Sequence, residues 1–74
     1  MYGAAWCSDC RRSKALLDAE GADYDYVDLD ADPSQADVAE SISGQKHIPV
    51  IVFADGSHLV EPSDEALRDK LAIV

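Results

Sequence analysis

Short hydrophobic runs along the chain alternate with segments in which apolar residues recur every three or four positions. The first pattern is typical of strands and the second of amphipathic helices. Gly and Pro, which interrupt both kinds of element, separate most of these segments. Together the patterns predict seven elements in this order: a strand over 1–5, a helix over 8–20, a strand over 23–30, a helix over 33–43, strands over 50–54 and 57–60, and a helix from 64.

Local signals mark the ends of the first two predicted helices. Gly21 and Gly44 are expected to stop them, because Gly tolerates the left-handed backbone that ends many helices. Asp32 is expected to cap the second helix, with Pro33 at its first helical position and Gln35 completing a capping box. The inner face of this helix is predicted to consist of Val38, Ala39 and Ile42.

The last part of the chain contains signals for a hairpin and a third helix. Asp55 and Gly56 predict a two-residue turn between the last two strands. Ser63 is expected to cap the last helix, with Leu67 and Leu71 facing the core.

The order of the elements predicts the architecture. A β-α-β unit requires parallel strands, whereas a hairpin joins antiparallel ones. The expected fold is therefore α/β, in the order β-α-β-α-β-β-α, with a four-stranded mixed sheet flanked by helices. Residues 1–74 are expected to form a single domain.

Composition limits the classes of function. A hydrophobic fraction of 47% is typical of a folded globule rather than a disordered chain. The formal net charge is −9, which disfavours binding to nucleic acid or to an anionic membrane. No stretch reaches the length of a membrane span, and residues 1–3 do not begin a signal peptide. We therefore expect a cytoplasmic protein, and we expect a chain of this size to act as a monomer.

Two cysteines, the only ones in the sequence, lie in the motif Cys7-Ser8-Asp9-Cys10. A helix that begins at Cys7 places its sulfur beside unpaired backbone N–H groups, which favour a thiolate. A disulfide across so short a loop would stabilise the fold little. We therefore expect a redox site, with Cys7 as the attacking nucleophile and Cys10 as the shielded resolving thiol. For Cys10 the alternative is a small buried hydrophobic residue.

The neighbours of the cysteines add charge and aromatic surface. Arg11 lies one helical turn after Cys7 and Arg12 is close by, and both add positive potential. Asp9, in contrast, opposes a neighbouring thiolate. Asp9 also suits the first turn of a helix without any role at the cysteines. Trp6 is either a core aromatic residue or an exposed platform beside the sulfur, and its place before Cys7 favours the platform.

His47 and His58 could join the cysteines as zinc ligands. Their spacing from the cysteines fits no zinc-finger pattern, however. We expect no metal site.

Several further motifs, at their present separations, give the chain a family resemblance. Beside the motif from Trp6 to Cys10, they are Tyr2, the predicted strand over Tyr24–Asp30, His47-Ile48-Pro49-Val50, and Phe53-Ala54-Asp55-Gly56-Ser57 leading to Pro62-Ser63. The chain resembles glutaredoxin-like proteins of the thioredoxin fold, most closely the mycoredoxins and glutaredoxin-like proteins of actinobacteria. The resemblance implies a cis peptide bond before Pro49 and a nucleophilic first cysteine. It also implies mixed disulfides between proteins and low-molecular-weight thiols as substrates, with no tightly bound cofactor.

The chain departs from the family pattern at two places. Ser8-Asp9 replaces the Pro-Tyr of glutaredoxins and the Gly-Tyr of mycoredoxins, which changes the expected redox potential. Glu61-Pro62 stands where glutathione-binding members have Gly-Gly, which weakens the case for glutathione. The residues expected to contact substrate are Trp6, Ser8, Asp9, Arg11, Ile48, Pro49, Ser63 and Asp64.

The sequence thus predicts a thiol-disulfide oxidoreductase that acts on disulfide-containing proteins with mycothiol or glutathione as co-substrate. One alternative is a dithiol electron donor reduced by a flavoprotein reductase, like the glutaredoxin-like donors of ribonucleotide reductase. Another is an iron–sulfur or zinc carrier that uses Cys7 with an exogenous thiol. A third is a redox-inert adaptor protein in which the cysteines are incidental.

Overall fold

A mixed sheet with helices on both faces forms the body of the protein, in a computed structural model that describes residues 1–73. The elements are β1 (Tyr2–Gly3), α1 (Ser8–Ala19), β2 (Val27–Asp28), α2 (Gln35–Ser43), β3 (Val50–Val52), β4 (His58–Val60) and α3 (Asp64–Ile73). The strand order is β2-β1-β3-β4. The β1–β2 pair is parallel, and the β1–β3 and β3–β4 pairs are antiparallel. The predicted α/β architecture and element order are confirmed.

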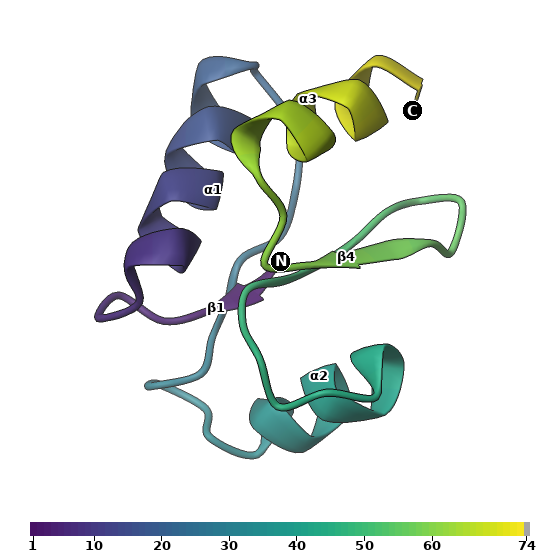
Figure 1. Ribbon diagram of the computed structural model, residues 1–74. Coiled ribbons are helices and arrows are strands. Elements are labelled where there is room, and N and C mark those ends of the chain that lie inside the picture. The colour runs from purple at the N-terminus through teal and green to yellow at the C-terminus, as the bar shows by residue number, and fades with distance from the viewer. Residues whose placement is uncertain (74) are drawn as a thin grey trace.

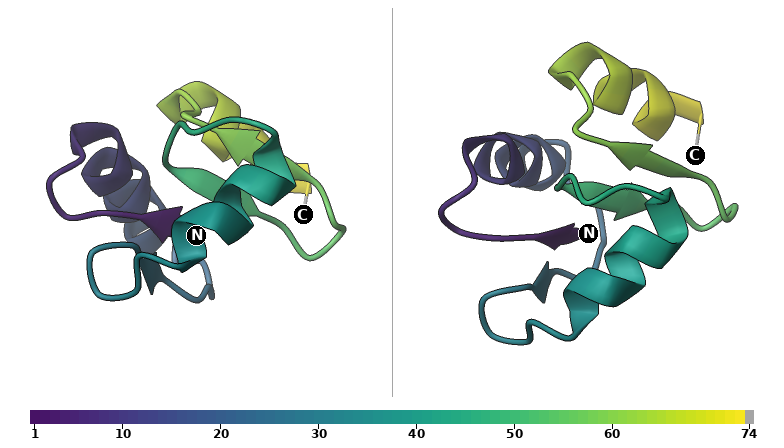
Figure 2. Two further views of the ribbon diagram at one scale, coloured as in Figure 1. Left: turned by 90° about the horizontal axis from the view of Figure 1, so that it is seen from below. Right: turned by 60° about the horizontal axis from the view of Figure 1, so that its bottom comes forward.

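The helices lie in two layers. α1 and α3 pack together on one face of the sheet, and α2 covers the other face (Figures 1 and 2). β1 is an inner strand and leads directly into α1, so the chain passes from the middle of the sheet to the start of that helix. Within residues 1–73 there is no helix with both the length and the apolar character needed to cross a membrane.

The strands are shorter than the sequence patterns predict. The segment expected as a strand over 23–30 pairs only at Val27–Asp28. Its hydrogen bonds with the first strand begin where the Met1 ammonium donates to Asp25 O (2.8 Å) and end where Leu29 N–H donates to Gly3 O (2.9 Å). Alternation of apolar and polar side chains does not fix the length of a strand. The backbone hydrogen bonds of a strand extend only as far as a neighbouring strand lies beside it.

The start of α2 differs from the prediction, whereas its end agrees. The helix begins at Gln35, so Ser34 rather than Asp32 is its N-terminal cap, and the expected capping box is wrong. The Asp32 carboxylate accepts a hydrogen bond from the Ser34 hydroxyl and is not used by the helix. Gly44 ends the helix with a left-handed backbone (φ 74°), as predicted.

The hairpin is confirmed, but its turn is longer than predicted. Phe53 N–H donates to Ser57 O (2.8 Å) and Gly56 N–H donates to Phe53 O (2.9 Å), which leaves three residues in the loop. Gly56 has a φ of 88° and takes the left-handed position that follows the turn in such three-residue loops.

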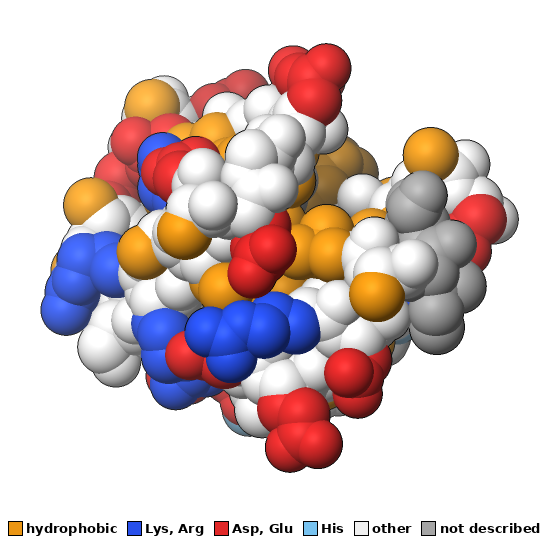
Figure 3. Space-filling view, turned by 90° about the horizontal axis from the view of Figure 1, so that it is seen from above, with side chains coloured by type: hydrophobic (Ala, Val, Ile, Leu, Met, Phe, Trp, Pro, Cys, Tyr) orange, Lys and Arg blue, Asp and Glu red, His pale blue; other side chains and the backbone are white. Residues whose placement is uncertain are grey.

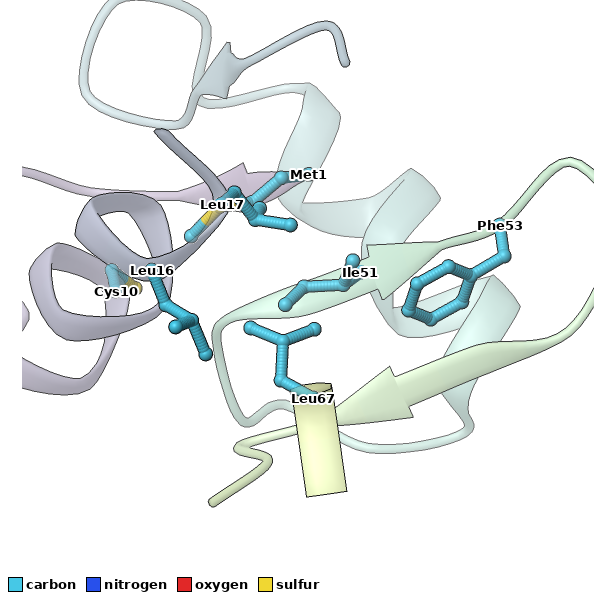
Figure 4. Packing of buried hydrophobic residues seen from close by; sticks show 7 residues of the cluster. All are labelled: Met1, Cys10, Leu16, Leu17, Ile51, Phe53 and Leu67. Carbon is cyan, nitrogen blue, oxygen red and sulfur yellow. The ribbon is translucent and has the colours of Figure 1, made fainter. Parts of the chain in front are cut away.

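The core lies between α1, α3 and the sheet (Figure 4). Leu67 of α3 has no exposed surface, and Leu16 and Leu17 of α1 are buried beside it. On α2 only Ala39 of the three predicted inner residues is buried, and Val38 is 39% exposed. A hollow of about 490 Å³ borders the core and is lined by residues that include Leu17, Tyr24, Phe53 and Leu71. Figure 3 looks down on this side of the molecule and shows hydrophobic side chains at the floor of a hollow.

Candidate active site

Cys7 is the N-terminal cap of α1. Its backbone is extended (φ −87°, ψ 116°), and the helix begins at the next residue. The Cys7 sulfur accepts a hydrogen bond from the Cys10 N–H at 3.3 Å, so it satisfies one of the N–H groups that a helix start leaves unpaired. The Cys7 side chain is half-buried, and both cysteines are free thiols. The predicted position of Cys7 at the helix rim is confirmed.

Cys10 is placed for a different chemistry. It is 1% exposed and forms part of the core cluster. Burial, and next the hydrogen bond with Cys7, raise the pKa of the Cys10 thiol to about 12. Cys10 therefore stays protonated at neutral pH, and the predicted shielding of this thiol is confirmed.

The reactivity of Cys10 should depend on folding. In a Cys7→Ser variant, alkylation of Cys10 by iodoacetamide is expected to stay slow well above a pH of about 8.5, because burial, the largest cause of the raised pKa of Cys10, remains in this variant. In urea the same thiol should react from a pH of about 8.5, the value for an unperturbed cysteine. A folded-state rate that rises near pH 8.5 would contradict the shielding.

Gly3 makes room for Cys10. A Cβ atom on Gly3 would lie 3.2 Å from both Cβ and Sγ of Cys10 and 3.4 Å from Tyr26 Cε1. Sequence analysis did not single out Gly3, because nothing local relates it to a cysteine seven positions later. The close approach follows from β1 running beside the first turn of α1.

Replacing Gly3 by Ala is expected to slow closure of the Cys7–Cys10 disulfide and to lower the unfolding free energy by about 1–3 kcal/mol, the cost of overpacking a core. The rate of closure can be followed by mass spectrometry after addition of a small oxidant. Gly56→Ala is the control, since its φ of 88° strains an added side chain but no atom lies within 4 Å of the Cβ. Equal closure rates in the two variants would show that the space left by Gly3 is not needed for Cys10 to close the disulfide.

The Ile48–Pro49 peptide lies beside Cys7. The bond is cis, as the family resemblance implied. The Cys7 thiol lies 3.9 Å from the Ile48 carbonyl oxygen, to which it donates. Two predicted site residues 41 positions apart in the sequence are thus in contact.

Trp6 is exposed beside the nucleophile. Its side chain is 70% exposed, so the alternative of a core aromatic residue is wrong. The indole Nε1–H donates to Asp30 Oδ1 at 2.9 Å, which fixes the ring against the turn after β2. Ser8, next along the chain after Cys7, is also exposed.

The two arginines after the cysteines have separate partners. Arg11 donates from Nη1 to the Ala5 carbonyl oxygen (2.6 Å), within the loop that carries Cys7. Arg12 was predicted only as a nearby positive charge and was not among the predicted substrate-contact residues. Its guanidinium contacts Asp9 of α1 and both Pro62 and Asp64 at the start of α3. The spacing of three residues on one helix predicts an ion pair between Asp9 and Arg12. No sequence pattern relates Arg12 to Asp64.

The start of α3 is tied to this network. The Ser63 hydroxyl accepts a hydrogen bond from Ala66 N–H (3.1 Å), which confirms it as the cap of the last helix. Asp64 lies 3.2 Å from Arg12. Both predicted substrate-contact residues therefore have internal partners, and their contacts with substrate stay a prediction.

Neither histidine is seen to contact a cysteine sulfur in the described part of the chain. His47 Nδ1 is 3.4 Å from Glu61 Oε1, and His58 is exposed on β4. No group of three or more His, Cys, Asp or Glu residues suited to a metal ion occurs within the part of the chain that the structure describes.

Comparison with known proteins identifies the family. A family model described as Glutaredoxin matches residues 1–59. The chain belongs to the glutaredoxin family. Two relatives named as glutaredoxins in Mycobacterium tuberculosis are 36% identical over 72 residues, which cover 96% of this chain and 86% of each relative. Mycoredoxin 1 of Corynebacterium glutamicum is 30% identical over 63 residues, which cover 84% of this chain and 77% of the relative.

The family defines the class of reaction. Glutaredoxins and mycoredoxins are thiol-disulfide oxidoreductases, so this glutaredoxin is an enzyme of that class. The resemblance and the enzyme class predicted from the sequence are confirmed. Glutaredoxins require no tightly bound cofactor, which agrees with a site built from thiols and backbone groups.

Proposed function

We propose that this glutaredoxin reduces mixed disulfides between proteins and a low-molecular-weight thiol, mycothiol or glutathione, with Cys7 as nucleophile. The observation that carries the proposal is the asymmetry of the two sulfurs. Cys7 is half-buried at a helix N-terminus and accepts a backbone N–H, whereas Cys10 is buried with a pKa of about 12. Such an arrangement suits one attacking and one resolving thiol.

In the first step, the Cys7 thiolate attacks the sulfur of the small thiol in the mixed disulfide. A bond forms between the two sulfurs, the original disulfide breaks, and the protein substrate leaves as a thiolate that takes up a proton. The exposed Trp6 ring and the Ile48 carbonyl, 3.9 Å from the Cys7 sulfur, are proposed to align the substrate. Ser8, Asp9, Arg11, Pro49, Ser63 and Asp64 are the further proposed contacts.

The adduct on Cys7 can then be resolved in two ways. A second small thiol attacks it, which gives a symmetrical small-molecule disulfide and regenerates Cys7. Alternatively Cys10, once deprotonated, attacks Cys7, which releases the small thiol and leaves an internal disulfide. Reduction of that disulfide requires two further thiols or a flavoprotein reductase. We propose that both routes operate in the cytoplasm with a monomer.

A coupled assay on one model mixed disulfide tests the proposal. Three arms supply mycothiol with its reductase, glutathione with its reductase, or a flavoprotein reductase alone, each with NADPH. Turnover with a small thiol is expected, and faster with mycothiol, because Glu61-Pro62 replaces the Gly-Gly of glutathione-binding members. Turnover with the flavoprotein reductase alone would favour the dithiol-donor alternative. No turnover in any arm would contradict both.

A further inference from the structure

Arg12 connects the cysteine helix to the start of α3. Its Nη1 lies 3.2 Å from Asp9 Oδ1, its Nε lies 3.2 Å from Asp64 Oδ1, and its Nη2 donates to the Pro62 carbonyl oxygen at 3.1 Å. A guanidinium group presents N–H bonds in several fixed directions and can serve three acceptors at once, whereas a lysine ammonium on a flexible stem cannot hold the same geometry.

The segment that Arg12 holds, residues 61–64, also contacts the cis-proline loop. Glu61 N–H donates to the Pro49 carbonyl oxygen at 3.0 Å, and the backbone of Glu61 is left-handed (φ 46°). Such a backbone is costly for a residue with a side chain and persists only where contacts enforce it. Segment 61–64 is thus fixed at one end by Pro49, next to Ile48 and the Cys7 sulfur, and at the other end by Arg12.

Arg12 also balances the charge next to the cysteines. Asp9 lies between Cys7 and Cys10 in the sequence, and its carboxylate is paired with Arg12. The Asp64 oxygen that faces Arg12 is buried and has no hydrogen bond within residues 1–73, so this ion pair is the contact that compensates it. Without Arg12, the Asp9 carboxylate, two positions from Cys7 in the sequence, would be uncompensated and would oppose negative charge on an attacking thiolate.

We propose that Arg12 is a positioning residue for the exchange reaction. Arg12 neutralises Asp9 beside the nucleophile, and it holds segment 61–64 against α1. The inference rests on the proposed role of Cys7 as nucleophile. It predicts two separable effects. Loss of the positive charge slows the reaction of Cys7, and loss of the guanidinium geometry weakens the binding of substrate.

The first effect is measured as the alkylation rate of Cys7 by neutral iodoacetamide in a Cys10→Ser background at pH 7. Arg12→Gln is expected to slow the reaction about two- to fivefold at low ionic strength, the range for partly exposed ion pairs. Molar salt should reduce this difference, because it screens charges beyond about 3 Å. Adding Asp9→Asn should restore the rate, because it removes the uncompensated carboxylate.

The control is Arg68→Gln, which makes the same change in net charge. Arg68 pairs with Glu20, away from the cysteines, and its loss should leave the Cys7 rate unchanged. Equal rates for Arg12→Gln and Arg68→Gln would overturn the electrostatic role. A slow rate that neither salt nor Asp9→Asn relieves would also overturn it, since it would indicate general loss of structure.

The second effect is measured in the coupled assay with Arg12→Lys, which keeps the charge. Its Cys7 alkylation rate should match that of the Arg12 protein, while KM for the mixed disulfide rises about two- to fivefold with kcat little changed. An unchanged KM would overturn the geometric role. If Arg12→Gln does not fold, Arg12→Met, which keeps the length of the side chain without its charge, takes its place in the alkylation test. Because alkylation needs no disulfide substrate, failure of the proposed function in the wild-type assay would be seen separately from failure of this inference.

Discussion

A Cys7→Ser variant is expected to lose thiol-disulfide exchange by about three orders of magnitude or more, as removal of a covalent nucleophile does in other enzymes. A serine hydroxyl at the same N-terminal cap can accept a hydrogen bond from the Cys10 N–H, but it does not ionise near neutral pH and is a much weaker nucleophile than a thiolate. Cys10 cannot replace the lost nucleophile, because it is 1% exposed and its pKa is about 12.

The matched variant is Cys10→Ser, which keeps the nucleophile and removes the resolving thiol. It should retain measurable turnover when a small thiol regenerates Cys7, and it should lose turnover supported by a flavoprotein reductase alone. The measurement is initial rate in the coupled assay with each reductant. An active Cys7→Ser variant would contradict the assignment of the nucleophile.

Leu67→Ala is expected to lower the free energy of unfolding by about 2–5 kcal/mol, the cost of a cavity at a buried leucine. Leu67, on α3, has no exposed surface and packs in the core with residues of α1 and β3 (Figure 4). Small domains are stable by only about 5–15 kcal/mol, so this single change removes a large part of the total.

Urea unfolding followed by circular dichroism measures the loss. The comparison is Val38→Ala on α2, whose side chain is 39% exposed and should cost well under half as much. Equal losses in the two variants would show that α3 is not essential to the core.

The element order could be predicted from the sequence because its signals are local. Gly44 ends α2 by its own backbone preference, and Ser63 caps α3 through an N–H group three residues later. Features that depend on pairing could not be predicted in the same way. The strand expected over 23–30 is short because its length is set by β1 beside it, and the helix expected to start at Pro33 starts at Gln35 because the Asp32 carboxylate bonds Ser34 instead.

The site shows the same division between local and distant information. The spacing of Cys7 and Cys10 predicts a helix start at the first and a shielded position for the second, and both are observed. The close approach of Gly3 to Cys10 and the contact between Arg12 and Asp64 depend on how separate elements meet. For Trp6 the sequence left two alternatives, a core aromatic residue or an exposed platform beside the sulfur. The exposure of the ring in the structure decided between them.

The central claim is that Cys7, at the N-terminal cap of α1, is the accessible nucleophile of the site, and one measurement tests it directly. The reduced Cys10→Ser variant is mixed at pH 7 with a mixed disulfide of mycothiol or glutathione, and mass spectrometry follows the adduct over time. The account predicts one small-thiol adduct, located on Cys7, that forms faster than the corresponding adduct on free cysteine. A Cys7 that reacts no faster than free cysteine would contradict it.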